Sequence, residues 1–246
     1  MTARVGLIIP SSNRMVEQEM VQHFPDGVQA HVMRLRMTGP HHVPLAALLP
    51  RVEEAARTLM DAKCDLVAFH CTAASTEAGL DGEQRALAAL ARAGAPIATI
   101  TATAIRRALA ALGARRIVLV TPYDARTTAD EAAFLRGAGY DVLHAVGHDL
   151  GGSDAFCEKP PQFWRDRTIE AARPEADAYL ISCANISTFG IIEELERRLD
   201  RPIVTSNQAV LWDALCRLGW RDVRGCPGRL FASAGEAQPA RLAGTA

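Results

Sequence analysis

Short apolar strands alternate with helical patterns along the whole chain, and this alternation occurs twice. Four apolar runs with strand character lie in the first half, at residues 4–10, 28–35, 65–71 and 96–100. Four more lie in the second half, at residues 115–122, 141–147, 177–183 and 201–206. Nearly continuous apolar strands that alternate with helices are typical of parallel sheets covered on both faces. The sequence therefore predicts an α/β fold built from parallel sheets.

Helical patterns fill the gaps between these strands. Apolar residues recur at the helical period in residues 14–24 and 45–62, and helices are also expected near 128–137, 162–173 and 189–199. Pro50 lies inside the second segment. Because proline lacks an amide hydrogen, we expect it in a first helical turn or at a break. The residues after about Gly228 are predicted to form a loose tail.

The second half of the sequence repeats polar as well as apolar features of the first half. Identical residues recur at an offset of 112 in the pairs Pro10/Pro122, Asp65/Asp177, Cys71/Cys183, Ser75/Ser187 and Thr76/Thr188. Residues 96–109 and 202–215 also resemble each other, at an offset of 106. Any doubly wound sheet shows some apolar similarity between its halves, but shared polar residues at strand ends favour two copies of one α/β unit.

No linker rich in proline, glycine or serine separates the two halves, which predicts two tightly apposed lobes. We expect the first lobe to comprise residues 1–100 together with 207–246, which supply a C-terminal helix and tail. The second lobe is expected to comprise residues 101–206.

Composition excludes several classes of function. The net charge is −1 and basic residues do not cluster with aromatic ones, so neither nucleic acid nor an anionic membrane is an expected partner. No apolar run approaches the roughly 18–20 residues of a membrane span. The N-terminus lacks the features of a secretory signal, and we expect a cytoplasmic protein. The 6 cysteines show no zinc-ligand spacing, and a chain of this size needs no disulfides.

Cys71 and Cys183 are the candidate functional residues. Each lies at the carboxyl end of a predicted strand, which is where ligands bind in open parallel sheets. Serine–threonine pairs follow each cysteine and are expected to cap the next helix, and a helix N-terminus favours the reactive thiolate. Two lobes facing each other would bring one thiol to each side of a ligand, as nucleophile or base and as acid. The alternative is a pair of buried structural cysteines.

Four segments resemble successive signatures of a known family. They are "GLIIPSSNRMVEQEM", "FHCTAAS", "LVTPYD" and "ISCANI", and they occur in order between about residues 4 and 220. Together they resemble the branch of the aspartate/glutamate racemase superfamily that contains maleate cis-trans isomerases and arylmalonate decarboxylases.

This resemblance implies a fold and a chemistry. The fold would be two pseudo-symmetric lobes, each with a four-stranded parallel sheet, and the active site would lie between them without a cofactor or metal. As in the isomerases, Cys71 would add as a thiolate to an alkene carbon and Cys183 would protonate the neighbouring carbon. In racemases two thiols exchange a proton at an α-carbon. The decarboxylases keep only the second-lobe cysteine, so the presence of Cys71 counts against simple decarboxylation.

The resemblance also implies residues that bind a dianionic substrate. Asn13 and Tyr123 match family donors to a carboxylate, although an asparagine after a strand is also a common turn residue. Backbone N–H groups around Thr72 and Ala184 would line an oxyanion pocket. The hydroxyl groups of Ser11 and Thr72 would add donors.

Two features differ from the family pattern. His70 precedes Cys71 on a strand and should point to the opposite face, so we expect a packed histidine. The isomerases use a second-lobe asparagine that is missing from residues 148–162, where only Ser153 and Asp154 are nearby. An aspartate facing a substrate carboxylate would repel it, which leaves room for an acid other than maleate.

The sequence thus predicts a cofactor-independent isomerase of a small unsaturated dicarboxylate. A racemase or decarboxylase of a related acid is the enzymatic alternative, and a non-catalytic small-acid binding protein is the other. A homodimer or higher homo-oligomer is expected for such lobed enzymes.

Overall fold

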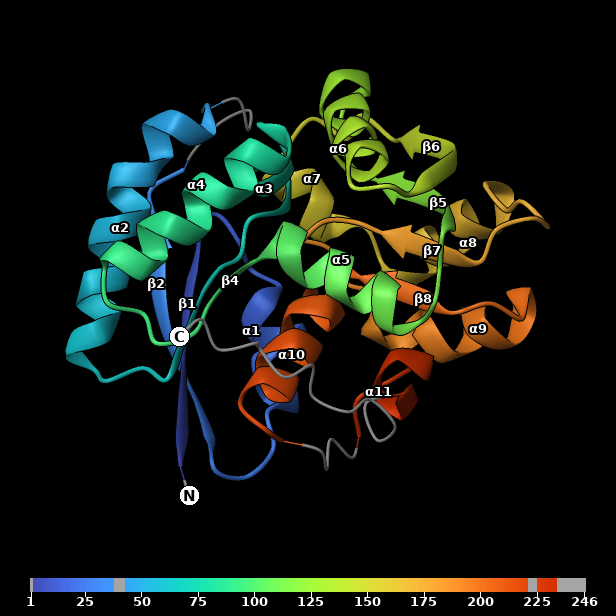
Figure 1. Cartoon of the computed structure of the whole chain (residues 1–246). Coiled ribbons are helices and arrows are strands. Elements are labelled where there is room, and N and C mark those ends of the chain that lie inside the picture. Colours follow the sequence, from blue (N-terminus) through green and yellow to red (C-terminus); the bar gives the residue numbers. More distant parts are fainter. Residues whose placement is uncertain (1, 38–42, 221–224, 234–246) are drawn as a thin grey trace.

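The computed structural model describes residues 2–37, 43–220 and 225–233 and contains two α/β lobes (Figure 1). The sheet of the first lobe has the strand order β2-β1-β3-β4, and all its strands are parallel. Its strands are β1 (Ala3–Pro10), β2 (Val28–Leu35), β3 (Leu66–Phe69) and β4 (Ala98–Ile100). The predicted fold class is therefore confirmed.

The second lobe repeats this topology. Its parallel sheet has the order β6-β5-β7-β8. Its strands are β5 (Arg116–Thr121), β6 (Asp141–Gly147), β7 (Ala178–Ile181) and β8 (Ile203–Thr205). The repeat extends to hydrogen bonds: the amide of Arg4 donates to Asp65 and the amide of Arg116 donates to Asp177, both at 2.8 Å. The recurring aspartates thus fix the start of the first strand in each copy.

Helices cover both sheets. Those of the first half are α1 (Val16–Glu19), the 3-10 helix η1 (Val21–His23), α2 (Leu45–Asp61), α3 (Thr72–Thr76), α4 (Gly79–Arg92) and α5 (Thr101–Ala111). Those of the second half are α6 (Ala125–Gly137), α7 (Ser153–Glu158), α8 (Pro161–Glu170), the 3-10 helix η2 (Phe189–Ile191), α9 (Ile192–Leu199), α10 (Ser206–Arg217) and α11 (Arg229–Ser233). None of the helices in the described ranges has the length and apolar composition needed to span a membrane.

The two lobes share one interface and one hydrophobic core. Helices α5 and α10 pack against each other between the sheets (Figure 1), and α6 of the second lobe contacts α3 and α4 of the first. The buried apolar residues of both lobes form a single cluster. Strands β4 and β8 end at or within one residue of the predicted boundaries. The assignment of α5 and α10 to particular lobes stays a prediction, and residues 221–224 and 234–246 of the predicted first lobe lie outside the described residues.

Two sequence-based expectations were wrong. Helix α2 continues through Pro50 at its sixth residue, neither in the first turn nor at a break. The carbonyl of Ala46, which loses its helical partner there, belongs to an exposed residue and can bind solvent. The predicted loose tail does not begin at Gly228, because α11 follows at once and buries Leu230 and Phe231; residues 234–246 lie outside the described residues.

Candidate active site

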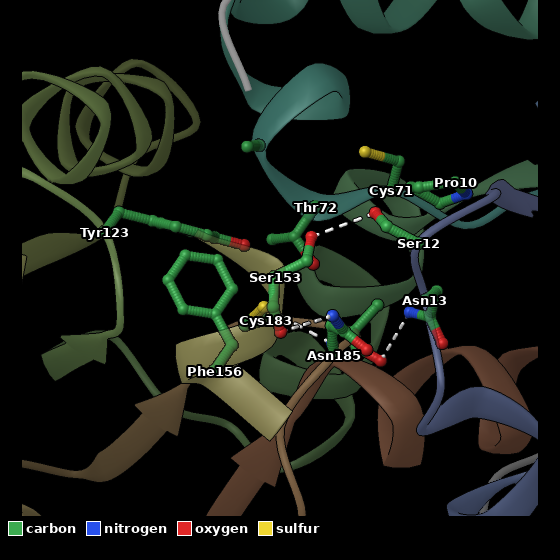
Figure 2. A pocket seen from close by; sticks show the side chains of 12 residues that line it. Pro10, Ser12, Asn13, Cys71, Thr72, Tyr123, Ser153, Phe156, Cys183 and Asn185 are labelled. Carbon is green, nitrogen blue, oxygen red and sulfur yellow. Dashed lines mark hydrogen bonds between the residues drawn. The ribbon is translucent and has the colours of Figure 1, made fainter. Parts of the chain in front are cut away.

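Two cysteine thiols lie at the carboxyl ends of equivalent strands and line one cavity. Cys71 follows β3 and Cys183 follows β7, and the two residues are 6% and 5% exposed. The cavity encloses about 330 Å³, including its opening to solvent. The lining residues are Pro10, Ser12, Asn13, Cys71, Thr72, Ala73, Tyr123, Ser153, Phe156, Cys183, Ala184 and Asn185 (Figure 2).

Burial keeps both thiols protonated when the cavity is empty. It raises the pKa of Cys71 to about 11, although a hydrogen bond from the backbone of Ala74 opposes the rise. It raises the pKa of Cys183 to about 12, against hydrogen bonds from the Tyr123 hydroxyl and the Asn185 amide. The expected preference for the thiolate near a helix N-terminus is therefore outweighed by desolvation.

Tyr123 places a hydroxyl group inside the cavity. The residue follows β5, is 6% exposed, and packs the edge of its ring against Phe156 at 5.9 Å between centroids. Its hydroxyl points into the cavity (Figure 2) and hydrogen bonds to Cys183. Burial and the neighbouring Cys183 raise the pKa of Tyr123 well above its usual value. It is therefore a neutral hydroxyl group that donates to Cys183, and its expected role toward a substrate carboxylate stays a prediction.

Asn13 joins the two lobes at the cavity wall. Its Nδ2 donates to the carbonyl of Ala184 at 2.8 Å, across the lobe boundary. Its Oδ1 accepts the amides of Met15 and Val16 at 3.0 Å and so caps the start of α1. The turn role considered for this residue is thus observed, whereas its role toward a substrate carboxylate stays a prediction. One amide hydrogen of Asn13 is left for a ligand.

Ser12, rather than Ser11, is the serine that lines the cavity. The hydroxyl of Ser11 is turned away and accepts the amide of Met37 at 3.1 Å. The hydroxyl of Ser12 lies 2.9 Å from that of Ser153 in α7, so that the two residues close one side of the cavity (Figure 2). Both serines lie in the turn after β1, and the sequence alone did not show which of them faces inward.

The segment of the second lobe around Ser153 and Asp154 does not direct a carboxylate into the cavity. Asp154 is exposed and pairs with Arg14 at 2.6 Å, outside the lining residues. The lining residue there is Ser153, with Asn185 beside it; the Nδ2 of Asn185 donates to the Ser153 carbonyl at 3.4 Å. An asparagine therefore does reach the cavity from the second lobe, from the segment after Cys183. The expected repulsion by an aspartate is absent from this arrangement.

The serine–threonine pairs are not N-caps of the kind expected. Ser75 and Thr76 lie inside α3, where both hydroxyls donate to the carbonyl of Thr72. Ser187 and the amide of Thr188 instead donate to the buried carboxylate of Glu19. The pairs brace the loops that follow the two cysteines rather than capping helices.

His70 is packed, as predicted. It is fully buried, with its ring nitrogens 2.9 Å from the Thr101 hydroxyl and 2.9 Å from the Asn207 Oδ1. Burial lowers the pKa of His70 to about 4, so the ring is neutral at pH 7. It points away from the cavity and connects β3 to α5 and α10.

A family model for arylmalonate decarboxylase matches residues 5–231. The chain belongs to the arylmalonate decarboxylase family. This family falls in the branch that the sequence motifs indicated. Its relatives include the arylmalonate decarboxylase of Bordetella bronchiseptica, 29% identical over 94% of this chain and 97% of the relative. They also include the maleate isomerase of Nocardia farcinica, 27% identical over 86% of this chain and 88% of the relative.

Solved structures of both enzymes share the fold of this family member. A cysteine-to-serine mutant of the Nocardia farcinica maleate cis-trans isomerase, with a covalently bound succinylcysteine intermediate, matches with a TM-score of 0.88. It is 24% identical, and the match covers 94% of this chain and 98% of that one. Arylmalonate decarboxylase matches with a TM-score of 0.74 at 28% identity, covering 93% and 99%.

Sequence reasoning missed five lining residues. Pro10, Ser12 and Ala73 are next to residues that were considered, and Asn185 lies within a quoted motif, two residues after Cys183. Phe156 had no signal, because α7 lacks a clear apolar period. Within the described ranges, no group of three or more histidine, cysteine or acidic side chains is arranged to hold a metal ion.

Proposed function

We propose that this family member is a cofactor-independent cis-trans isomerase of a small unsaturated dicarboxylate. The observation that carries the proposal is that Cys71 and Cys183, from equivalent positions in the two lobes, line the same small cavity. The decarboxylases of this family are expected to use only the second-lobe cysteine, so a second thiol in the cavity favours an isomerase. The maleate isomerases among the relatives and a succinylcysteine intermediate in one of them support this substrate class.

The proposed reaction uses each thiol once in each direction. Cys71 first releases its thiol proton to solvent through the opening of the cavity. Its thiolate then forms a C–S bond to one alkene carbon, and the π electrons take the proton of Cys183 at the neighbouring carbon. The resulting single bond rotates. The Cys183 thiolate then removes a proton from the same carbon, the C–S bond breaks, and the trans diacid leaves. No net oxidation or reduction occurs, so atoms and electrons balance without a cofactor.

Neutral donors around the cavity suit two carboxylates. Tyr123 is a neutral hydroxyl beside Cys183, and we assign it to a substrate carboxylate or to the developing enediolate. The backbone at Thr72 and Ala184 and the free amide hydrogen of Asn13 supply further donors. Ser12 takes the place proposed for Ser11. Phe156 provides an apolar wall against the substrate carbons.

Decarboxylation or racemisation is the second candidate, because arylmalonate decarboxylase is 29% identical to this chain. Proton NMR in deuterated water separates the candidates, with maleate, substituted maleates and arylmalonates as substrates. We expect a cis-to-trans change of the alkene signals. Loss of CO2 from an arylmalonate without alkene conversion would replace the proposal with decarboxylation, and deuteration at an α-carbon would indicate racemisation.

Alkylation and substitution of the two cysteines test the alternative that the protein only binds a small acid. For an isomerase, substrate should protect Cys71 from alkylation, and turnover should be lost in both Cys71→Ala and Cys183→Ala. Full activity in either variant contradicts the two-thiol mechanism. Protection without turnover of any of the acids would leave only binding.

We also propose that the protein works in the cytoplasm as a homodimer or higher homo-oligomer. The mechanism needs reduced thiols, and all 6 cysteines are free, which suits a reducing compartment. Light scattering coupled to size exclusion gives the oligomeric state directly, and a monomer would contradict the assembly.

A further inference from the structure

Glu131 is a buried carboxyl group that the proposed reaction does not use. It lies on α6 and is completely buried. The hydroxyl of Ser182 donates to its Oε1 in a short hydrogen bond. Its other oxygen, Oε2, has no hydrogen-bond partner among the described residues. An ionised carboxylate in such a position would be costly, whereas a neutral carboxylic acid needs fewer partners.

A chain of buried hydroxyl groups connects Glu131 to the cavity. Thr72, which lines the cavity, lies 3.0 Å from the hydroxyl of Ser206, the first residue of α10. The Ser206 hydroxyl lies 3.4 Å from that of Ser182, which in turn contacts Glu131. The four residues are at most 2% exposed. The chain therefore crosses from the first lobe to the second without reaching solvent.

The protonation state of Glu131 limits the direction of these hydrogen bonds, because each hydroxyl has a single proton. An ionised Glu131 can only accept, so Ser182 donates to it, Ser206 donates to Ser182, and Thr72 donates to Ser206. The Thr72 hydroxyl then has only lone pairs for a ligand and repels an anion. The hydrogen bond from Thr72 to Ser206 has this direction. A protonated Glu131 can instead donate to Ser182, which allows every bond to reverse when a ligand binds and frees the proton of Thr72.

We propose that Glu131 is a positioning residue that acts as a neutral acid: its proton orients the hydroxyl chain so that Thr72 donates to a carboxylate of the bound substrate. The inference rests on the proposed function for the substrate class. Ser182 occupies the position before Cys183 that His70 occupies before Cys71. The two copies thus use this position differently. In the first lobe it holds a buried histidine that hydrogen bonds to neighbouring helices, and in the second lobe it holds a member of the hydroxyl chain.

The surroundings of Glu131 favour its neutral form. Burial raises the pKa of Glu131 to about 8, against the opposing hydrogen bond from Ser182. The ionisable groups that feel its charge are Tyr123 and Cys183, neither of which is a cation. The titratable residues of the other elements packed against α6 are Asp81, Glu83, Arg85 and Arg92 on α4 and Asp141 and His144 on β6, and α3 has none. None of these contributes to the shift, so no positive charge offsets the cost of ionisation.

Infrared spectroscopy tests the neutral acid without any ligand. We expect a protonated carboxyl band at pH 7 that disappears as the pH is raised past 8 and is lost at pH 7 in Glu131→Gln. Glu196→Gln is the matched control, since Glu196 is also buried but accepts amides near α11, away from the chain. Absence of the band at pH 7 in the wild type overturns the inference, whatever the enzyme's substrate.

The affinity for succinate, a saturated dicarboxylate that cannot react, tests the direction of the hydrogen bonds along the chain of hydroxyl groups and can be measured by calorimetry. We expect the dissociation constant of the wild type and of Glu196→Gln to rise about tenfold or more between pH 6.5 and 9.5, because a hydrogen bond to a charged group is lost. Glu131→Gln has a neutral amide that can also donate, so its affinity should stay constant. Thr72→Val should bind weakly at both pH values.

The Ser182→Ala variant distinguishes an effect transmitted by the chain of hydroxyl groups from direct repulsion of succinate by the charge of Glu131. Without Ser182, the charge of Glu131 remains but no longer orients Thr72, so we expect affinity to be independent of pH. A pH-dependent loss equal to that of the wild type in Ser182→Ala or Glu131→Gln would overturn the inference. Failure of succinate to bind at either pH counts against the proposed substrate class, whereas the carboxyl band still decides the state of Glu131.

Discussion

Cys71 and Cys183 occupy equivalent positions but have different neighbours. Cys183 has hydrogen-bond donors in Tyr123 and in the Asn185 amide, and it also lies near the Glu131 carboxyl group. Cys71 has one backbone donor. The pKa of Cys71 is raised less, to about 11 against about 12 for Cys183. Both thiols are thus neutral at pH 7, and the proposed roles of nucleophile and acid follow the family resemblance.

The reactivity of Cys71 should depend steeply on pH. Since the thiolate is the reactive form and the pKa of the thiol is raised to about 11, its alkylation rate by iodoacetamide should rise about tenfold per pH unit from 7 to 10. Peptide mapping by mass spectrometry measures the rate at this residue, and Cys71→Ser identifies its peptide. A rate that levels off near pH 7 would show that desolvation does not control this thiol.

His70 should make the fold sensitive to acid. Its pKa is lowered from 6.5 to about 4 in the folded protein, so the unfolded chain binds one more proton between these values. Stability from the neutral ring is therefore present above pH 6.5 and lost as the pH falls, by about 3 kcal/mol at pH 4. Urea unfolding at pH 7 and pH 4.5 should show a smaller loss in His70→Gln. An equal loss in both proteins would assign the acid sensitivity elsewhere.

Single residues were the hardest feature to predict from the sequence. The repeat indicated both cysteines, and the motif indicated Asn13 and Tyr123, which all line the cavity. Ser11 was chosen instead of Ser12 because the sequence does not show which way a residue after a strand points. Glu131 gave no signal, since its environment depends on Ser182 and on packing that only the folded chain creates.

Secondary-structure elements were predicted where apolar periodicity is strong. The strand at Val28–Leu35 was located with its observed bounds, because its pattern is uninterrupted. Helix α7 was missed, since glycines and a double proline flank its 6 residues and hide any period. A helix through Pro50 was not expected, because the sequence does not show that a nearby carbonyl is exposed and can bind solvent instead.

Close packing at the end of β6 should be essential for the position of Tyr123. A Cβ atom on Gly147 would lie 2.4 Å from the Thr128 hydroxyl and 2.6 Å from the Tyr123 carbonyl. Gly147→Ala should therefore cost about 1–3 kcal/mol and shift Tyr123, lowering turnover. Gly137→Ala is the control, because it lies in α6 with open space around it and should be neutral or slightly stabilising. Equal melting temperatures and rates in the two variants would contradict this account.

At the scale of the whole molecule, duplication explains the site. Two copies with one topology place equivalent strand ends around one cavity, and Asn13 and Ala184 join the copies there. The offset of 112 residues made this arrangement predictable. The two tightly apposed lobes were predicted, but the packing of α5 against α10 was not, because the sequence does not show which helices meet between the lobes.

The buried carboxyl group of Glu131 should also make the stability of the whole protein depend on pH between about 4.5 and 8. The pKa of Glu131 is raised to about 8 in the folded protein, so between about pH 4.5 and 8 the folded state holds a proton that the unfolded chain has lost. From this group the free energy of unfolding falls as pH rises, by about 1.4 kcal/mol per unit. The difference in stability between Glu131→Gln and the wild type should therefore grow from pH 5.5 to 7.5 in urea unfolding. A constant difference would mean that Glu131 is ionised in the fold.

The central claim is that Cys71 adds to an unsaturated diacid and Cys183 supplies the proton. Incubating the Cys183→Ser variant with maleate, followed by intact mass measurement and peptide mapping, tests it most directly. We expect a mass increase of one maleate, located on Cys71 and absent from the Cys71→Ser Cys183→Ser double variant. Modification of a different residue, or an unmodified Cys71 while the wild type isomerises maleate, would contradict the claim.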